Sequence, residues 1–355
     1  RQTVKGCRMI RWAEPGCAPA LAEIMFRAVR EGESPYSEPQ RAAWMPARAG
    51  TTWLSEQLNA HPDVWIPAIK ELHYFTRSSR YVGPSHLADG SIVQRLFSRD
   101  KPYRQYRKAA QRAIASNIVR PSIRKLMWDA NFLLRRPSDH WYATLFSQGF
   151  GSVTGEITPR YSMLECDDIR ELRRLIPDLK LIFIMRDPVE RAWSLVKYHE
   201  QRGGQALTEL PADELRHRAF SDPIVRQSDY EAILQRWRSV FPAEQLLELY
   251  FDEIREQPDA LLRRIQRFLG VPITGLSEDR VRGKVNGSFR KPMPEDLRQA
   301  LIAYYRPMMA RLSEAEGGYF SRWLERYDSR PAEPATAVSG TLMPGLEPHS
   351  PPLNL

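Results

Sequence analysis

Apolar positions along the chain follow two patterns, and their alternation predicts the fold. Residues 179–185 (LKLIFIM) are almost continuously apolar, which is typical of a strand buried on both faces of a parallel sheet. Residues 246–251 predict a second strand, and apolar residues at helical spacing predict helices at residues 53–60, 230–237 and 259–269. Strands that alternate with helices indicate an α/β fold in which helices flank a central parallel sheet.

The residues after the first of these strands predict a helix start. Asp187 can cap the helix, Pro188 suits its first position, and Glu190 stands where a capping box places an acidic residue. A polar turn at the carboxyl end of a buried strand is where open α/β sheets bind ligands. We therefore expect a binding site at this turn.

The two ends of the chain differ from its middle. Residues 1–40 are irregular, with a short helix predicted at 18–30, and residues 329–355 contain six prolines and no periodicity, which predicts a disordered tail. One domain is therefore predicted over residues 41–325. No apolar run reaches the length of a transmembrane helix. The three cysteines, Cys7, Cys17 and Cys166, have neither metal-ligand spacing nor a disulfide pattern, which favours a reducing, cytoplasmic location.

Charge gives a weaker signal. The net charge is +9, but the 52 basic residues are dispersed among 43 acidic ones, without a basic block or an interleaved aromatic motif. An anionic substrate or nucleotide explains the excess as well as a nucleic acid does, and solvated arginine is a further explanation. Because no aromatic-basic motif supports it, nucleic-acid binding is the weakest interpretation.

Residues 48–53 (RAGTTW) form the first candidate anion site. Gly50 allows a sharp turn, Thr51 and Thr52 supply hydroxyl groups, and the following helix presents its N-terminus, to which Arg48 adds a cation. The pattern lacks the first glycine and the lysine of a Walker A loop. A plain Gly-Thr turn before a helix remains the alternative.

The stretch that leads into this loop predicts only a weak strand. Four apolar residues stand between Arg41 and Pro46, and proline cannot donate to the hydrogen-bond ladder of a central strand. We expect a demoted strand here and a poorly seated loop.

Residues 48–75 resemble the 5′-phosphosulfate loop, the helix and the following segment of the sulfotransferase family, in its carbohydrate branch, which includes heparan sulfate sulfotransferases and bacterial relatives. Three further segments match in order. Residues 155–161 (GEITPRY) are similar to an element near the acceptor cleft, residues 186–194 to the 3′-phosphate segment, and residues 284–291 to a late loop over the nucleotide. The likeness covers about residues 41–320.

The resemblance implies a P-loop nucleotide-kinase-like, three-layer fold. It also implies transfer of a sulfuryl group from 3′-phosphoadenosine-5′-phosphosulfate (PAPS), without a metal, to a hydroxyl or amine of a carbohydrate or glycolipid. The implied catalytic residues are Glu71, the general base, with His73 and Arg48. Lysine is common in the family where Arg48 stands; arginine, with a pKa above about 12, would act by electrostatic stabilisation alone. The implied donor-binding residues are Arg48, Ala49, Gly50, Thr51, Thr52, Trp53, Arg186, Ser194, Arg290 and Lys291.

Plain structural roles stand beside these assignments. Arg186 can pair with Asp187 or Glu190, and Glu71 with Lys70. His73 can pack in its aromatic run, Trp53 can belong to the core, and Arg191 suits either the surface or a nucleotide contact. At the level of function, the alternatives are a P-loop nucleotide kinase, which the missing Walker A lysine opposes, and an inactive nucleotide-binding protein.

Overall fold

The computed structural model describes residues 41–45, 50–67, 69, 71–78, 80–81, 92–99, 103–104, 106–108, 110–111, 115, 122–149, 152–203, 210–274 and 292–328. The predicted irregular start and the predicted tail lie outside these residues. The chain divides into two compact units, residues 1–308 and residues 309–355. The first unit contains the sheet and every candidate site residue.

In the part of the chain that the structure describes, five parallel strands form one sheet in the order β2-β3-β1-β4-β5. The strands are β1 (Arg41–Met45), β2 (Val64–Trp65), β3 (Val153–Ile157), β4 (Lys180–Met185) and β5 (Leu246–Tyr250). The predicted parallel sheet is thus confirmed, and β4 and β5 coincide with the two strands that the apolar pattern predicts.

The first strand corrects an expectation. β1 is central, with Trp44 in register with Ile157 of β3 and Met45 in register with Phe183 of β4. The prediction of a demoted strand was wrong because Pro46 follows the last residue of β1, so its missing N–H group takes no place in the described ladder. Pro46 itself lies outside the described residues.

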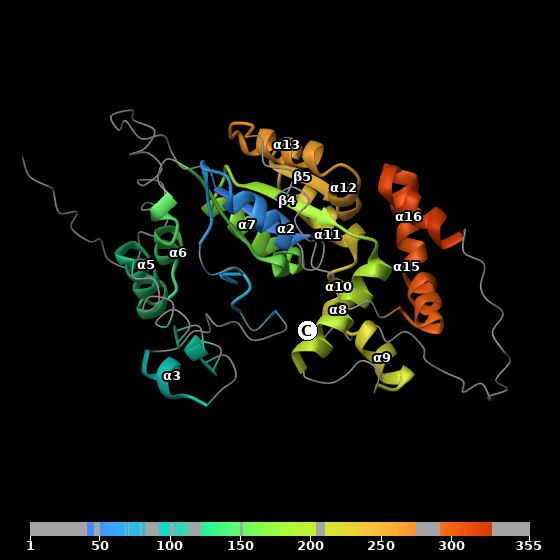
Figure 1. The fold of residues 1–355 in the computed structure, drawn as a ribbon, viewed down its shortest axis with the longest axis horizontal. Helices are drawn as coiled ribbons and strands as arrows, with labels where there is room; N and C mark the ends of the chain where they lie inside the picture. The colour runs from blue at the N-terminus through green and yellow to red at the C-terminus, as the bar shows by residue number, and fades with distance from the viewer. Residues whose placement is uncertain are drawn as a thin grey trace, which may run out of the picture. The chain divides into compact units, whose positions relative to one another are not determined.

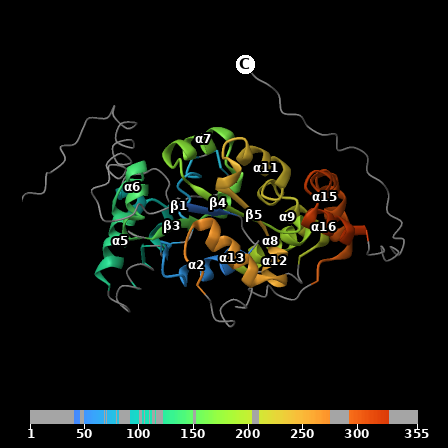
Figure 2. The same ribbon diagram turned by 90° about the horizontal axis from the view of Figure 1, so that it is seen from above.

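Helices cover both faces of the sheet (Figure 2). On one face lie α7 (Cys166–Leu175) and α11 (Tyr230–Arg238), and on the other lie α2 (Thr51–Asn59), α12 (Phe251–Glu256) and α13 (Pro258–Leu269). The predicted helices at residues 53–60, 230–237 and 259–269 therefore exist. The other described helices, labelled in Figure 1, are α3 (Ile92–Phe97), α5 (Ile123–Leu134), α6 (Asp139–Thr144), α8 (Pro188–Gly203), α9 (Ala212–Ala219), α10 (Asp222–Arg226), α15 (Glu295–Glu316) and α16 (Gly318–Asp328). Short 3-10 turns are η1 (Ser147–Gly149), η2 (Pro159–Met163) and η4 (Ala243–Gln245).

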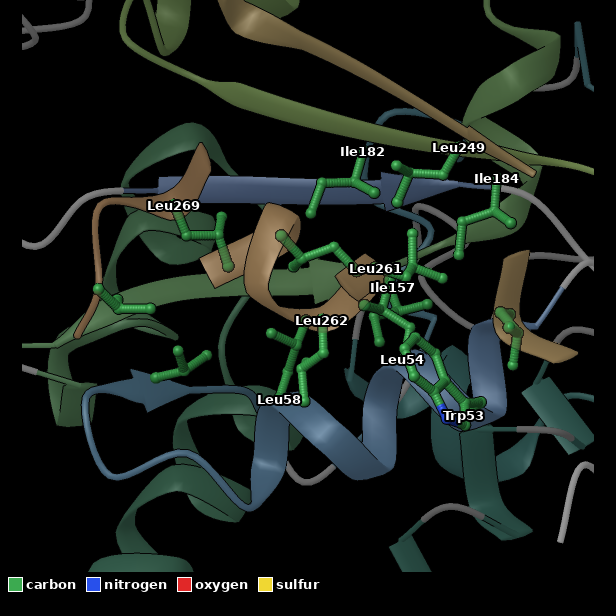
Figure 3. Packing of buried hydrophobic residues seen from close by; sticks show 14 of the residues in the cluster. Trp53, Leu54, Leu58, Ile157, Ile182, Ile184, Leu249, Leu261, Leu262 and Leu269 are labelled. Carbon is green, nitrogen blue, oxygen red and sulfur yellow. The ribbon is translucent and has the colours of Figure 1, made fainter. Parts of the chain in front are cut away.

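One hydrophobic core lies between the sheet and the layer of α2, α12 and α13 (Figure 3). Ile182 and Ile184 of β4 face this layer, whereas Phe183 packs edge-on against Tyr230 of α11, with ring centroids 6.2 Å apart. Alternate side chains of a strand point to opposite faces, so β4 must be apolar at nearly every position when helices cover both. This explains the continuous apolar run.

Local signals mark the start of α8 and the end of α13, as the sequence predicts. The Asp187 carboxylate accepts from the N–H groups of Val189 and Glu190, at 3.0 and 3.3 Å, and so caps α8. Gly270 ends α13 in the left-handed conformation, with φ of 72°. Within the described residues, no helix has the length and apolar character needed to cross a membrane.

Candidate functional site

The carboxyl ends of the strands gather the predicted residues at one edge of the sheet. Gly50 follows β1, Arg186 follows β4 and Phe251 follows β5. The Glu71 N–H group donates to the carbonyl of Ile157, the last residue of β3, at 3.1 Å. β1 lies between the β2–β3 and β4–β5 halves, and such a switch in strand order is where open α/β sheets bind ligands.

Gly50 is fixed by both conformation and space. Its φ of 100° is left-handed, and a Cβ there would lie 2.3 Å from Ile254 Cδ1 and 3.3 Å from Phe251 Cδ2. Gly50 is the N-cap residue of α2 but supplies no side-chain hydrogen bond to the N–H groups of the first turn. Other groups must therefore accept from these N–H groups. Thr51 is buried and Thr52 is exposed at the first turn. The glycine turn and the helix N-terminus that the sequence predicts are therefore present.

Trp53 belongs to the core. It is 3% exposed and packs with the cluster beneath the sheet (Figure 3). Its place in the core is thus confirmed, and its contact with the donor stays a prediction.

Arg186 lies at the end of β4 with its backbone held by one side chain. The Tyr230 hydroxyl donates to the Arg186 carbonyl at 2.6 Å and accepts from the Arg186 N–H group at 3.2 Å. The guanidinium lies 4.7 Å from the Phe251 ring centroid and 3.6 Å from a Glu190 carboxylate oxygen. The pairing with Glu190 is thus confirmed, and contact with a phosphate stays a prediction.

A second guanidinium shares the Phe251 ring. The Arg255 guanidinium lies 5.1 Å from the ring centroid, so two cationic side chains contact the Phe251 ring. Burial lowers the pKa of Arg186, Glu190 opposes this effect, and the positive charge of Arg255 lowers the pKa further. The two like charges repel each other, and an anion bound near both would relieve that repulsion.

α8 carries Ser194 two turns beyond Arg186. Positions 186, 190 and 194 are four residues apart, so the last two share a helix face. Ser194 is 3% exposed. The structure places Arg191 differently from either expectation: it is fully buried and donates to Ser228 Oγ and Gln227 Oε1, both at 2.7 Å. Arg191 therefore ties α8 to the end of α10.

Glu71 and His73 lie together at the end of β3. His73 Nε2 is 3.5 Å from Glu71 Oε2, and His73 Nδ1 is 3.4 Å from Thr76 Oγ1. Both residues have left-handed backbones, with φ of 64° and 58°, which non-glycine residues rarely adopt. The Glu71 side chain is 45% exposed and the His73 side chain 12%, so the pair stands between solvent and the interior.

A guanidinium group interacts electrostatically with Glu71. Burial lowers the pKa of Arg160, and the negative charge of Glu71 opposes this effect. Arg160 lies in η2, within the GEITPRY segment.

Four predicted donor residues, Arg48, Ala49, Arg290 and Lys291, lie outside the described residues, as does Lys70. Their roles stay predictions.

Sequence reasoning missed several members of the site. Tyr230 and Arg255 stand in ordinary helical patterns, so only their positions in space reveal them. Phe251 carried one usable signal, because it is the last residue of the predicted strand 246–251, although the structure makes it the first residue of α12. Glu156 stands inside the GEITPRY segment but is hidden in a strand.

Comparison with models of known protein families identifies the family of this chain. The model described as the sulfotransferase family matches residues 46–275. The chain belongs to the sulfotransferase family. The matched region includes β2 to β5 and all of the described site residues.

Curated relatives of this sulfotransferase-family chain are named as carbohydrate enzymes. Heparan sulfate glucosamine 3-O-sulfotransferase 6 of Mus musculus is 27% identical over 212 residues, covering 51% of this chain and 60% of that protein. Bifunctional heparan sulfate N-deacetylase/N-sulfotransferase 2 of Bos taurus is 29% identical over 106 residues, covering 27% of this chain and 12% of that protein. The matches thus span less than two thirds of either relative.

One solved structure supports the fold. A sulfotransferase from Alicyclobacillus acidocaldarius aligns with a TM-score of 0.54 at 22% identity, covering 81% of this chain and 99% of that chain.

Proposed function

We propose that the protein transfers a sulfuryl group from PAPS to a hydroxyl or amine of a carbohydrate-like acceptor. One observation carries the proposal. In a chain of the sulfotransferase family, one edge of the sheet assembles a glycine-capped helix N-terminus, a cationic pair on Phe251 and the Glu71–His73 pair.

The donor would lie across the ends of β1 and β4. The N-terminus of α2 and the two threonines suit the 5′-phosphosulfate, because a helix N-terminus attracts anions. Arg186 suits the 3′-phosphate as a bidentate donor if the phosphate displaces Glu190, and Ser194 would add a hydroxyl. We assign the rest of the donor contacts to Arg48, Ala49, Arg290 and Lys291. We also place the chain in the P-loop nucleotide-kinase-like, three-layer architecture, which the helices on both faces of the sheet support.

The transfer step needs a proton acceptor and a stabilised leaving group. The acceptor oxygen or nitrogen attacks sulfur, a new bond to sulfur forms, and the bond from sulfur to the 5′-phosphate oxygen breaks. The acceptor proton passes to the Glu71 carboxylate, and adenosine 3′,5′-bisphosphate leaves. Helix N–H groups and guanidinium groups would stabilise the charge on the departing phosphate.

An acidic saccharide suits the acceptor side. Two relatives are named for heparan sulfate, and Arg160 adds a cation beside Glu71. A cation next to the base would hold an anionic substituent of the acceptor.

Ligand-dependent thermal unfolding tests the proposal. Adenosine 3′,5′-bisphosphate should raise the unfolding temperature more than ATP with Mg²⁺ does, because bound ligand stabilises the folded state. Stronger stabilisation by ATP with Mg²⁺ would indicate a nucleotide kinase and contradict the proposal. No response to either ligand would indicate an inactive relative.

A further inference from the structure

Glu156 is a buried carboxyl group that the transfer step does not use. It lies in β3, one residue before the strand ends, and is 1% exposed. Thr158 Oγ1 donates to Oε2 at 2.6 Å, whereas the hydroxyls of Tyr142 and Tyr161 donate to Oε1 at 2.5 and 2.9 Å. Removing a carboxylate from water is unfavourable, so three converging hydroxyls indicate a group retained for its hydrogen bonds.

One of these hydroxyls connects Glu156 to the Glu71–His73 segment. The Tyr74 N–H group donates to the Tyr161 oxygen at 3.0 Å. Because Tyr161 accepts from this backbone donor, its own proton is directed toward Glu156. The bonds therefore run from Tyr74 through Tyr161 to the carboxylate.

The segment is held at both ends by the end of β3. Glu71 is held at its N–H group by the Ile157 carbonyl, and Tyr74 is held through Tyr161 and Glu156. The two left-handed residues, Glu71 and His73, lie between these attachments. Unfavourable backbone conformations persist only where their surroundings impose them.

The charges that act on Glu156 also connect it to the segment that holds Glu71 and His73. Burial raises the pKa of Glu156, the three hydroxyls oppose that rise, and a positive charge on His73 opposes it further. Glu156 thus interacts with the imidazole that faces Glu71.

We propose that Glu156 is a positioning residue for the proton-accepting pair, holding Glu71 and His73 in their left-handed conformations through the hydroxyl of Tyr161. The inference rests on the proposed function for its effect on turnover, and on geometry alone for its effect on the segment.

Tyr161→Phe tests the connection, and Tyr142→Phe is its matched control. Each variant removes one hydroxyl from the same carboxylate oxygen, but only Tyr161→Phe removes the acceptor of the Tyr74 N–H group. Hydrogen exchange should accelerate about tenfold or more at the Tyr74 amide in Tyr161→Phe and stay within about twofold in Tyr142→Phe.

Turnover supplies the second measurement, with PAPS as donor and a heparan sulfate oligosaccharide as acceptor. In Tyr161→Phe, kcat should fall about tenfold to a hundredfold while the KM for PAPS is unchanged, because misplaced reacting groups lower kcat. Glu156→Gln should lose less, since the amide oxygen still accepts from Tyr161.

The outcomes separate the two proposals. Equal acceleration of exchange in both tyrosine variants, or none in Tyr161→Phe, overturns the positioning role. So does an unchanged kcat in Tyr161→Phe. If the wild-type protein consumes no PAPS, the proposed function fails, and exchange at the Tyr74 amide alone decides whether Glu156 positions the segment. Should Tyr161→Phe not fold, Glu156→Gln takes its place, with slower turnover at unchanged donor KM as the expected result and unchanged turnover as the contrary one.

Discussion

At the scale of single residues, Gly50 stands at the start of α2 and lies close to the side chains of Ile254 and Phe251 in α12. Its left-handed φ excludes most side chains, and Ile254 occupies the space that a Cβ would need. Since Phe251 also borders that space and contacts Arg186, a shift at Gly50 would reach the cationic pair.

Gly50→Ala should therefore destabilise the protein by about 2–5 kcal/mol, the sum of a left-handed alanine and an overpacked contact, and weaken binding of adenosine 3′,5′-bisphosphate. Urea unfolding and titration calorimetry measure the two effects. Gly317→Ala is the matched control, because Gly317 has φ of 63° but no atom within 4 Å of its added Cβ. It should cost only about 1–2 kcal/mol and leave ligand affinity unchanged. Equal losses in the two variants would show that the contact with Ile254 is unimportant.

Glu71→Gln should lower turnover about 100-fold or more while affinity for adenosine 3′,5′-bisphosphate is retained, because the amide keeps the shape of the side chain but cannot accept the proton. Single-turnover assays with PAPS measure the first effect and calorimetry the second. The exposed Glu244, in η4, gives the control Glu244→Gln, which should change neither. Normal turnover in Glu71→Gln would remove this carboxylate from the mechanism.

At the scale of elements, the connection from β4 to α8 carries most of the proposed 3′-phosphate site. The strand ends at Met185, Arg186 follows, and the Asp187 carboxylate fixes the first turn of the helix that holds Ser194. The cap thus sets the direction in which α8 leaves the sheet, and with it the separation of the two predicted phosphate ligands.

Asp187→Ala should destabilise the protein by about 1 kcal/mol and weaken affinity for adenosine 3′,5′-bisphosphate, because the first turn of α8 loses its cap. Ser122→Ala removes the cap of α5, whose N–H donor is Lys125, on a helix that contributes no residue to the proposed site. It should cost a similar free energy of unfolding without changing ligand affinity. Calorimetry and urea unfolding compare the pair, and an unchanged affinity in Asp187→Ala would separate the cap from the binding site.

At the scale of the whole molecule, buried ionisable groups make the free energy of unfolding depend on pH. Burial raises the pKa of Glu156 above its ordinary value of 4.5. Between that value and the raised pKa, the folded protein binds more protons than the unfolded chain does. The contribution of Glu156 to stability is therefore fully present below pH 4.5 and is lost as the pH rises through the raised pKa.

Glu156→Gln should accordingly remove this loss. Urea midpoints measured from pH 4.5 upward should fall less in the variant than in the wild-type protein. Glu171→Gln is a control of opposite sign, because hydrogen bonding to Arg174 lowers the pKa of Glu171 and its small, exposed contribution is lost as the pH falls. Parallel pH profiles for wild type and Glu156→Gln would show that the carboxyl group is not perturbed by folding.

The predictions that succeeded concern local patterns. The apolar run of β4 follows from burial on both faces, and the start of α8 follows from Asp187 and Pro188, which neighbour the residues they act on. The Gly50 turn is similarly local, since one residue supplies both the conformation and the helix start. The predicted α/β alternation needed only the order of these elements along the chain.

The sequence by itself therefore determined the class of fold, the elements that carry the site and the family likeness, because each depends on residues close together in the chain. Only the tertiary structure decided that β1 is central despite Pro46, that Arg191 is buried against α10, and that Glu156 reaches Tyr74 through Tyr161. It also placed Arg186 and Arg255 on the ring of Phe251. These features depend on strand pairing and packing between segments distant in the sequence, and local spacing does not encode such contacts.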